Sequence, residues 1–283
     1  MRKIVGFVTY DGLPQLTPDD RLALDALATR GYDARPVVWT DASIAWPSFD
    51  ALVLRSCWDY HLQPASFARW LSAIAAAGVR LFNPADLALW NMEKTYLVDL
   101  ARAGVRIVPT HVVEPRTWST TAALRQETGW SDIILKPAIS ATAWRLCRVP
   151  PHARELPADV VQALATERFL AQPFLNGIAD GEWSVVFFGG VFSHAVIKRP
   201  RDGEFRVQEE YGGRATPAVL DAAAQAIAAA PGRSLYARVD GILTPDGFVL
   251  IELELLEPAL YLASAPHAAS RFADAIFESL LFR

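Results

Sequence analysis

Two acidic side chains interrupt an otherwise apolar run near the C-terminus, at positions 252 and 254 of the segment 251–258. Residues two apart in a β-strand face the same side, so a strand here would present the carboxylates of Glu252 and Glu254 together. Asp240, at the end of the preceding apolar run, is placed to add a third oxygen ligand. Three carboxylates suit a hard cation such as Mg²⁺, which shares the phosphates of a substrate. A solvated strand face, or acids paired with arginines, explains the same residues equally well.

The chain contains 27 basic residues, of which only four are lysines. Lys136 follows the apolar run 133–135, so it lies at the C-terminal edge of an expected strand, where α/β proteins bind ligands such as phosphate. Lys94 follows Asn91, the expected cap of a helix, and a cation is unfavourable there unless an anion lies nearby. Lys198 ends another apolar run. The alternative for all three is an ordinary lysine whose ammonium group reaches solvent.

Arg206 precedes the pair Gly212-Gly213, and an arginine fork beside two glycines suits bidentate recognition of a carboxylate or phosphate. A surface salt bridge explains Arg206 as well. The five histidines show no metal-ligand spacing, and no nucleophile elbow is present, so acyl-enzyme chemistry is not indicated. Cys57 and Cys147 form no CxxC pair, which indicates neither a disulfide framework nor a structural zinc site.

Length and charge limit the class of protein. With 283 residues, 52% of them hydrophobic, the chain can bury a sizeable core in one large domain or in two to three small ones. Its net charge of −4 argues against general binding to nucleic acid or to anionic membranes. The apolar run at residues 4–8 is too short for a signal peptide or a membrane span. We therefore expect a cytoplasmic protein, in keeping with its cysteine usage.

The elements that must position these residues begin with an alternating N-terminal part. Strands are expected at 4–8, 35–39, 51–54 and 79–82, and helices at 18–30 and 64–77. Thr17 provides an N-cap and Pro18 suits the first helical position. This alternation predicts a parallel sheet covered by helices.

Two further units are expected after a break at Asn83-Pro84. The second unit begins near residue 90, with helices at 93–103 and 120–127, a short strand before Pro109, and strands at 133–136 and 168–172. The third opens at Gly181, with a hairpin of strands 183–188 and 191–198, a helix at 217–230, strands at 235–239 and 247–253, and a helix at 268–281.

The order of these signals resembles the ATP-grasp superfamily over nearly the whole chain. It looks closest to the branch of glutathione synthetase-like and ribosomal-protein-modifying ligases, through residues 82–84, 91–94, 205–206 with 212–213, and the terminal carboxylates. Within that branch, the runs 55–60, 181–184, 193–200 and 252–258 are similar to D-cycloserine-forming ligases. The resemblance implies an α/β ATP-grasp fold, with a parallel N-terminal domain (1–90), two α+β subdomains (91–173 and 174–283) and the nucleotide between the subdomains.

The resemblance also implies ATP and one or two Mg²⁺ ions as cofactors, and a role for each signal. Nucleotide contacts would come from Lys94, Lys136, Gln172, Phe174, Leu175, Glu182 and Lys198, with the hinge 172–175 next to adenine and Glu182 on the ribose. Metal ligands would be Asp240, Glu252 and Glu254, and the catalytic cations Arg238, Lys198 and Arg206. The substrate would contact Arg55, Asp59, Tyr60, Arg206, Gly212 and Gly213.

Two features depart from the family pattern. The loop 137–144 lacks the glycines with which many relatives cradle phosphate, and Glu254 stands where many relatives carry asparagine. The resemblance implies a ligase that forms an amide-like C–N bond through an acyl phosphate on a small amino-acid-like substrate, with cyclisation to D-cycloserine as its specific form. The protein would act as a monomer or homodimer. The glycine-poor loop leaves open an ATP-binding sensor or scaffold without turnover.

Overall fold

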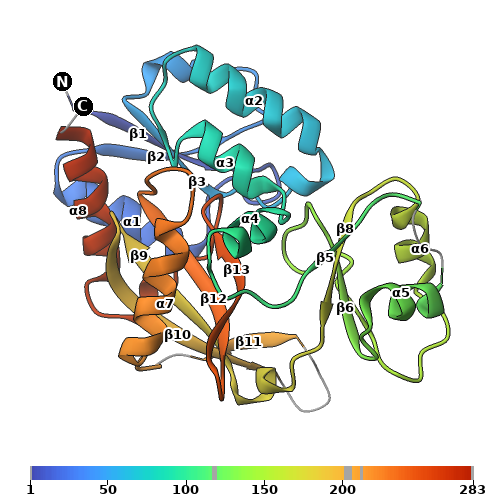
Figure 1. Ribbon diagram of the computed structural model, residues 1–283. Helices are drawn as coiled ribbons and strands as arrows, with labels where there is room; N and C mark the ends of the chain where they lie inside the picture. Colours follow the sequence, from blue (N-terminus) through green and yellow to red (C-terminus); the bar gives the residue numbers. More distant parts are fainter. Residues whose placement is uncertain (1, 117–119, 201–205, 211–212, 282–283) are drawn as a thin grey trace.

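The computed structural model describes residues 2–116, 120–200, 206–210 and 213–281, which form three β-sheets with helices packed on them (Figure 1). None of the helices in these ranges combines the length and the apolar composition that crossing a bilayer requires.

The N-terminal sheet is parallel, with strand order β2-β1-β3-β4. Its elements are β1 (Ile4–Thr9), α1 (Pro18–Thr29), β2 (Asp33–Val38), the 3₁₀ turn η1 (Trp46–Ser48), β3 (Ala51–Ser56), η2 (Tyr60–Leu62), α2 (Pro64–Ala76) and β4 (Leu81–Phe82). The Thr17 side chain caps α1 by accepting a hydrogen bond from the Asp20 N–H at 2.9 Å. The parallel pairing of the four strands confirms the predicted parallel sheet covered by helices.

The predicted helix at 93–103 is wrong in its extent. Two short helices occupy this region, α3 (Ala85–Met92) and α4 (Tyr96–Arg102), and Lys94 lies in the turn between them. Asn91 lies inside α3 and not at a cap. Its side chain bonds the backbone of β13 (Gly247–Glu254) and its extension, donating to the Leu253 carbonyl and accepting from the Leu255 N–H, both at 2.7 Å.

The second sheet is antiparallel, with strand order β5-β8-β6-β7. It contains β5 (His111–Val113), α5 (Thr121–Thr128), β6 (Ile133–Pro137), β7 (Cys147–Val149), α6 (Ala158–Leu164) and β8 (Phe169–Pro173). The strand expected before Pro109 is only an isolated bridge between Ile107 and Leu250. The sequence predicted α5, β6 and β8, but not β5, β7 or α6.

The third sheet is also antiparallel, with strand order β11-β10-β9-β12-β13. The elements up to β13 are η3 (Asn176–Asp180), β9 (Glu182–Phe188), β10 (Val191–Pro200), β11 (Val207–Glu210), α7 (Pro217–Ala228) and β12 (Tyr236–Thr244). The chain ends with η4 (Leu262–Ser264) and α8 (Ala268–Leu281). The predicted hairpin is confirmed, and Gly189 and Gly190 make its turn with φ angles of 57° and 80°.

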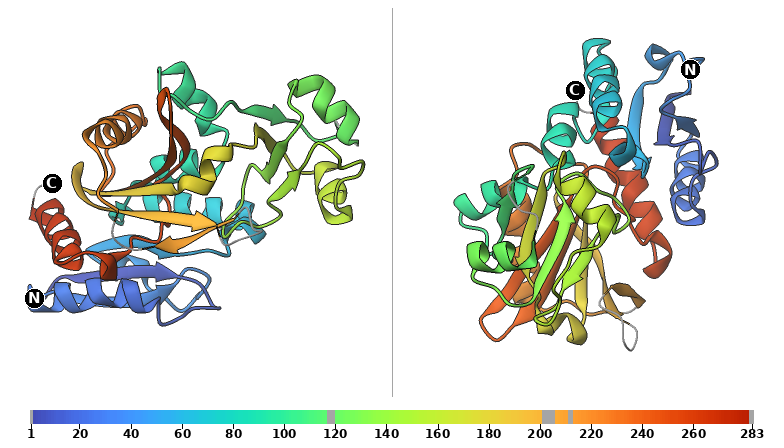
Figure 2. Two further views of the ribbon diagram at one scale, coloured as in Figure 1. Left: turned by 90° about the horizontal axis from the view of Figure 1, so that it is seen from below. Right: turned by 90° about the vertical axis from the view of Figure 1, so that its right-hand side faces the viewer.

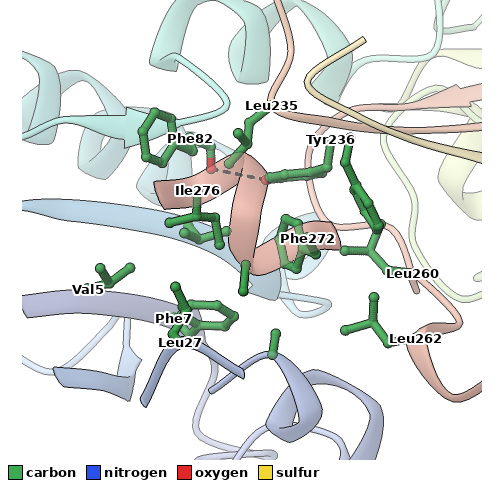
Figure 3. Packing of buried hydrophobic residues seen from close by; sticks show 14 of the residues in the cluster. Val5, Phe7, Leu27, Phe82, Leu235, Tyr236, Leu260, Leu262, Phe272 and Ile276 are labelled. Carbon is green, nitrogen blue, oxygen red and sulfur yellow. Dashed lines mark hydrogen bonds between the residues drawn. The ribbon is translucent and has the colours of Figure 1, made fainter. Parts of the chain in front are cut away.

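The two ends of the chain share one hydrophobic core. Helix α8 lies against α1 beside the N-terminal sheet (Figures 1 and 2). Phe272 of α8 packs among Phe7, Phe188 and Tyr236, whose ring centroids lie 4.9–6.3 Å from its own (Figure 3). The N-terminal sheet is therefore covered by a helix from the opposite end of the chain. The division into domains at residues 90 and 173 stays a prediction.

Candidate active site

A cavity of about 840 Å³ collects side chains from the second and third sheets and from the segment that follows β3 of the N-terminal sheet. Most of the predicted site residues line it, namely Tyr60, Lys94, Lys136, Gln172, Phe174, Leu175, Glu182, Lys198, Arg238, Asp240, Glu252 and Glu254. Residues that are far apart in sequence thus meet in one place.

The three predicted metal-binding carboxylates lie on the neighbouring strands β12 and β13. Asp240 pairs in register with Glu252, and Arg238 with Glu254, so all four side chains face one side of the ladder. Arg238 Nη2 donates to Asp240 Oδ2 at 2.8 Å and also to Glu254. Ser184 Oγ donates to Asp240 Oδ1 at 2.5 Å. The predicted common face of Glu252 and Glu254 is confirmed.

The surroundings shift the pKa values of Asp240 and Glu254 in opposite directions. Burial raises the pKa of Asp240, but the charges of Arg238 and Lys198 outweigh it and lower this pKa to about 2. Burial raises the pKa of Glu254 to about 7, because Arg238 only partly offsets the desolvation and Glu252 adds negative charge. The cavity lining contains five carboxyl side chains and four cationic ones, and the raised pKa of Glu254 reflects this imbalance.

This donor set fits Mg²⁺, because it consists of carboxyl oxygens in a cavity where carboxyl groups outnumber cationic side chains. Within the described ranges, no three His, Cys, Asp or Glu side chains are arranged as a ready-made metal site. The reason lies in their present partners, since Arg238 bonds Asp240 and Glu254 while Lys94 pairs with Glu252. A cation would have to replace these partners in part.

Two of the three predicted phosphate-binding lysines are paired within the protein. Lys94 Nζ lies 3.1 Å from Glu252 Oε1 and donates to the Ser140 carbonyl at 2.5 Å. Lys198 Nζ lies 2.5 Å from Glu182 Oε1 and 3.6 Å from Asp240 Oδ2. Burial opposes the charge on each lysine, but these carboxylates outweigh it and raise the pKa of both.

Lys136 differs from the other two lysines. It lies on β6 with 7% of its surface exposed, and its ammonium group has no hydrogen bond or ion pair to any residue that the structure describes. Burial lowers the pKa of Lys136, and Glu252 opposes this effect only in part. A buried ammonium without a partner is costly, so this side chain is suited to an anion that enters the cavity.

The segment 172–175 connects β8 to η3 and borders the same cavity. Gln172 Nε2 donates to Thr110 Oγ1 at 2.9 Å. The Phe174 N–H donates to the Asp132 carbonyl at 2.9 Å, so that amide is already used by the protein. The Arg148 guanidinium lies 3.6 Å from the centre of the Phe174 ring. A planar base placed here would therefore meet an apolar and aromatic edge.

The residues predicted to bind substrate are only partly brought together. Tyr60 lines the cavity and donates to the Ser140 carbonyl at 3.2 Å. Arg55 is 1% exposed and lies outside the cavity lining, with its Nε 2.8 Å from Asp20 Oδ1. Asp59 accepts a hydrogen bond from Trp39 Nε1 at 2.9 Å, also outside the lining. A substrate contact for Arg55 or Asp59 does not fit these positions, because protein groups already bond their charged ends.

The predicted Arg206 site is also not assembled as expected. Arg206 is exposed and outside the cavity lining, and its Nη2 lies 3.4 Å from the Leu146 carbonyl oxygen. Gly213 packs against Trp183, where an added Cβ would lie 2.6 Å from the ring. Gly212 lies outside the described residues. The structure therefore does not place Arg206 at the cavity as a catalytic or substrate-binding group.

Glu257 was not among the predicted site residues, and the loop 137–144 was predicted only as glycine-poor. Glu257 lines the cavity three residues after Glu254, and burial, strengthened by the Glu254 charge, raises its pKa well above the usual range. Its signal was its place in the same acidic run. In the loop 137–144, the Ser140 carbonyl accepts two hydrogen bonds, and Thr142 and Ala143 adopt φ angles of 50° and 56° without being glycines.

Comparisons with known proteins agree with this geometry. Residues 5–83 match the family model of the D-cycloserine synthetase DcsG N-terminal domain, and residues 96–260 match that of the prokaryotic glutathione synthetase ATP-grasp domain. The cycloserine biosynthesis protein DcsG of Streptomyces lavendulae is 32% identical over 279 residues, which cover 91% of this chain and 92% of that protein. A glutathione synthetase of Parasynechococcus marenigrum (strain WH8102) is 28% identical over 244 residues, which cover 85% of this chain and 70% of that synthetase.

Solved structures give the same result. The crystal structure of D-cycloserine synthetase DcsG superposes with a TM-score of 0.86 at 29% identity, covering 98% of this chain and 99% of that chain. A D-alanine–D-alanine ligase from Bacillus anthracis, complexed with ATP, shares the fold with a TM-score of 0.68 at 15% identity, covering 99% of this chain and 97% of its own. The chain therefore belongs to the ATP-grasp superfamily of ATP-dependent carboxylate–amine ligases, as a mixed α/β protein related to D-cycloserine synthetase and glutathione synthetase.

Proposed function

We propose that this protein uses ATP and Mg²⁺ to join a carboxyl-type group and a nitrogen nucleophile of a small amino-acid-like substrate, through an acyl phosphate. The observation that carries the proposal is the unpartnered ammonium group of Lys136, which lies in the same cavity as the carboxylates of β12 and β13. An excess of carboxylate beside an unpaired buried cation is suited to a ligand that brings both phosphate and a divalent ion.

The reaction has two steps. A substrate oxygen attacks the γ-phosphorus of ATP and ADP leaves, which gives an acyl phosphate. The nitrogen then attacks the acyl carbon, inorganic phosphate leaves, and the nitrogen loses a proton. The task of the protein is to hold the reacting groups together and to compensate their charge.

Each cation of the cavity has a role in this scheme. Lys136 contacts ATP phosphates directly, and Lys94 and Lys198 contribute further positive charge from their positions beside Glu252 and Glu182. Arg238 compensates the negative charge of the acyl phosphate and of the tetrahedral intermediate. Its guanidinium is held in place by Asp240 and by the Tyr261 ring, whose centre lies 5.4 Å away.

Asp240, Glu252 and Glu254 would hold Mg²⁺, which when bound neutralises charge on the phosphates that Lys136 also contacts. The number of metal ions is one or two. Glu182 would contact the ribose and the segment 172–175 the adenine, at the border between the subdomains 91–173 and 174–283 that follow the N-terminal domain 1–90. The second sheet lies within the first of these ranges and the third sheet within the other.

The specific substrate we propose is an O-ureido-serine-like compound, cyclised to D-cycloserine when its ureido nitrogen attacks the acyl phosphate and water removes the carbamoyl group as ammonia and carbon dioxide. Support comes from the similarity to D-cycloserine synthetase, which extends over the N-terminal part as well as over the ATP-grasp part. Purified protein incubated with ATP, Mg²⁺ and O-ureido-serine is expected to release cycloserine. Failure to detect cycloserine, together with phosphate release on another amino acid, would remove this substrate and keep the ligase.

A second function, an ATP-binding sensor without turnover, is favoured by the loop 137–144, which contains no glycine. Phosphate release measured over a panel of amino acids and dipeptides separates the two functions. ATP binding without turnover on every substrate would favour the sensor, whereas absence of ATP binding would contradict both.

The central test is Lys136→Met. We expect ATP affinity to fall about 10- to 100-fold, because a charged phosphate contact contributes about 1.5–3 kcal/mol. The free energy of unfolding should stay the same or rise, since the variant removes a buried ammonium without a partner. Lys3→Met is the matched control, because Lys3 Nζ donates to the Leu280 carbonyl, far from the cavity. Unchanged ATP affinity in Lys136→Met, measured by calorimetry, would contradict the phosphate role.

A further inference from the structure

Glu257 is a buried carboxylate whose place in the cavity is fixed by the surrounding chain. It follows β13 by three residues and is 9% exposed. Its backbone carbonyl accepts a hydrogen bond from Trp58 Nε1 at 3.2 Å. The next carbonyl, that of Pro258, accepts from Arg55 Nη2 at 2.6 Å. Trp58, in the segment after β3, and Arg55, in β3 itself, thus hold the backbone at Glu257 and at the residue that follows it.

The carboxylate of Glu257 has no partner of its own. The other acidic groups of the cavity each face a cation at short range, with Arg238 at Asp240 and Glu254, Lys94 at Glu252 and Lys198 at Glu182. For Glu257, the part of the chain that the structure describes offers neither a hydrogen bond nor an ion pair to the carboxyl oxygens. Burial and the charge of Glu254 raise the pKa of Glu257 and oppose its ionisation, so an external cation is the partner that would hold this side chain as a carboxylate.

The surroundings of Glu257 favour an organic cation over a metal ion. Trp58, whose Nε1 bonds the Glu257 backbone, and Tyr60 line the same cavity, and aromatic rings attract ammonium groups but are not ligands for Mg²⁺. Lys94 and Arg238 are the cations whose charges reach Glu257. A substrate with its ammonium group at Glu257 would therefore extend its carboxyl end toward the positive side chains that the proposed reaction uses.

We infer that Glu257 binds the ammonium group of the amino-acid-like substrate and thereby determines which substrates the ligase accepts. The inference rests on the proposed function for the location of the reaction, but binding of the ammonium group does not require turnover. Glu257 also lies outside the set of residues assigned to ATP and Mg²⁺, so its effect can be separated from theirs.

The experiment measures binding to protein saturated with a non-hydrolysable ATP analogue and Mg²⁺. The probes are D- and L-serine, D- and L-alanine and O-ureido-serine, each paired with the analogue that carries hydrogen in place of the ammonium group. We expect the wild-type protein to prefer at least one ammonium compound over its analogue by about 10- to 100-fold, the range for a hydrogen-bonded charge pair. Glu257→Gln keeps the shape of the side chain and should reduce this preference to about threefold or less.

The affinity for the ATP analogue and the Mg²⁺ concentration for half-saturation should stay within about twofold in Glu257→Gln. Glu155→Gln is the matched control, because Glu155 is exposed and lies outside the cavity lining. It should keep the full preference. Glu257→Asp, which withdraws the carboxylate by one methylene, should give an intermediate preference and serves if Glu257→Gln does not fold.

Three results would overturn the inference. The first is a Glu257 variant that keeps the preference for the ammonium compound. The second is a raised Mg²⁺ requirement with that preference intact, which would make Glu257 a metal ligand. The third is a wild-type protein that binds ATP but none of the ammonium compounds. Failure of the proposed function is seen separately, as absence of ATP binding or of phosphate release with every substrate.

Discussion

Arg55 and Lys136 are two buried cations with opposite surroundings. Both follow apolar strand residues, at 52–54 and 133–135, so their sequence contexts are alike. Arg55 is held by Asp20 and by the Pro258 carbonyl, whereas no described group bonds Lys136, and the charge of Glu252 offsets its burial only in part. The first charge is therefore satisfied by the fold and the second awaits a ligand. Only the partners distinguish the two, and these come from segments distant in sequence.

The Arg55–Asp20 pair leads to a prediction about stability. Asp20 also accepts hydrogen bonds from Ser56 Oγ at 2.7 Å and Thr17 Oγ1 at 3.0 Å. Asp20→Ala would leave a buried guanidinium without its counter-charge, which costs about 3–5 kcal/mol in the free energy of unfolding. Asp274→Ala, at the more exposed pair with Arg30, should cost less than about 1 kcal/mol. Urea unfolding measures both, and equal costs for the two variants would contradict a structural role for Arg55.

The two cysteines give a prediction about pH. Burial raises the pKa of Cys147 to about 11, and it raises the pKa of Cys57 well above its usual range. The thiolate is the reactive form, so iodoacetamide should modify the folded protein very slowly at pH 8, and faster at Cys147 as the pH approaches 11. Cys57 should react only after unfolding in urea. Mass spectrometry of timed samples measures this, and rapid labelling of Cys57 at pH 8 in the folded protein would contradict its burial.

At the scale of elements, strong local signals were predicted well and short elements were not. Helix α1 has both its N-cap Thr17 and Pro18 at its first position, and these local contacts persist in the structure. The three-residue strands β5 and β7 have too few residues to show an alternation. Helix α3 was missed because Asn83-Pro84 indicated a break, whereas Pro84 directly precedes the helix. In each failure, contacts to distant segments decide the conformation.

Asn83 shows such distant contacts in a motif that the sequence analysis singled out. Its Nδ2 donates to the carbonyls of Tyr236 at 2.9 Å and Leu255 at 2.7 Å, and its Oδ1 accepts from the Leu235 N–H at 2.5 Å. This side chain thus fixes the start of β12 and the segment directly after β13 relative to β4. It supports the cavity without entering it.

Asn83→Ala should therefore destabilise the fold and disturb the site together. Loss of bonds to three buried backbone groups is expected to cost about 2–4 kcal/mol, since unsatisfied buried groups cost about 1–3 kcal/mol each and relaxation recovers part. Asn176→Ala, at the start of η3, is the control for loss of an amide. Urea unfolding and ATP affinity are measured on the same samples. A stable variant with normal ATP affinity would contradict the role assigned to Asn83.

For the whole molecule, the site and the core share one property: both join segments from opposite ends of the chain. The expected cofactors and most of the site residues followed from the family resemblance and from the order of motifs. The joining of α8 to the N-terminal sheet did not follow, because an amphipathic helix shows which residues it buries and not what it packs on. The same limit applied to Arg206, whose place outside the cavity depends on the path of the third sheet.

The shared core predicts a single cooperative unfolding transition. Phe272→Ala, at a fully buried position between Phe7 and Phe188, should cost about 3–5 kcal/mol. Leu281→Ala, at the exposed end of the same helix, should cost less than about 0.5 kcal/mol. The loss should appear equally in the signals of both halves, because the cluster includes residues of the N-terminal sheet and of β9 and β12. A fragment ending at residue 92 should not fold alone, since its sheet would expose Phe7 and Val5 where α8 now lies. Two separate transitions in urea, or a folded fragment, would instead show that the N-terminal sheet is independent of the helix that closes it.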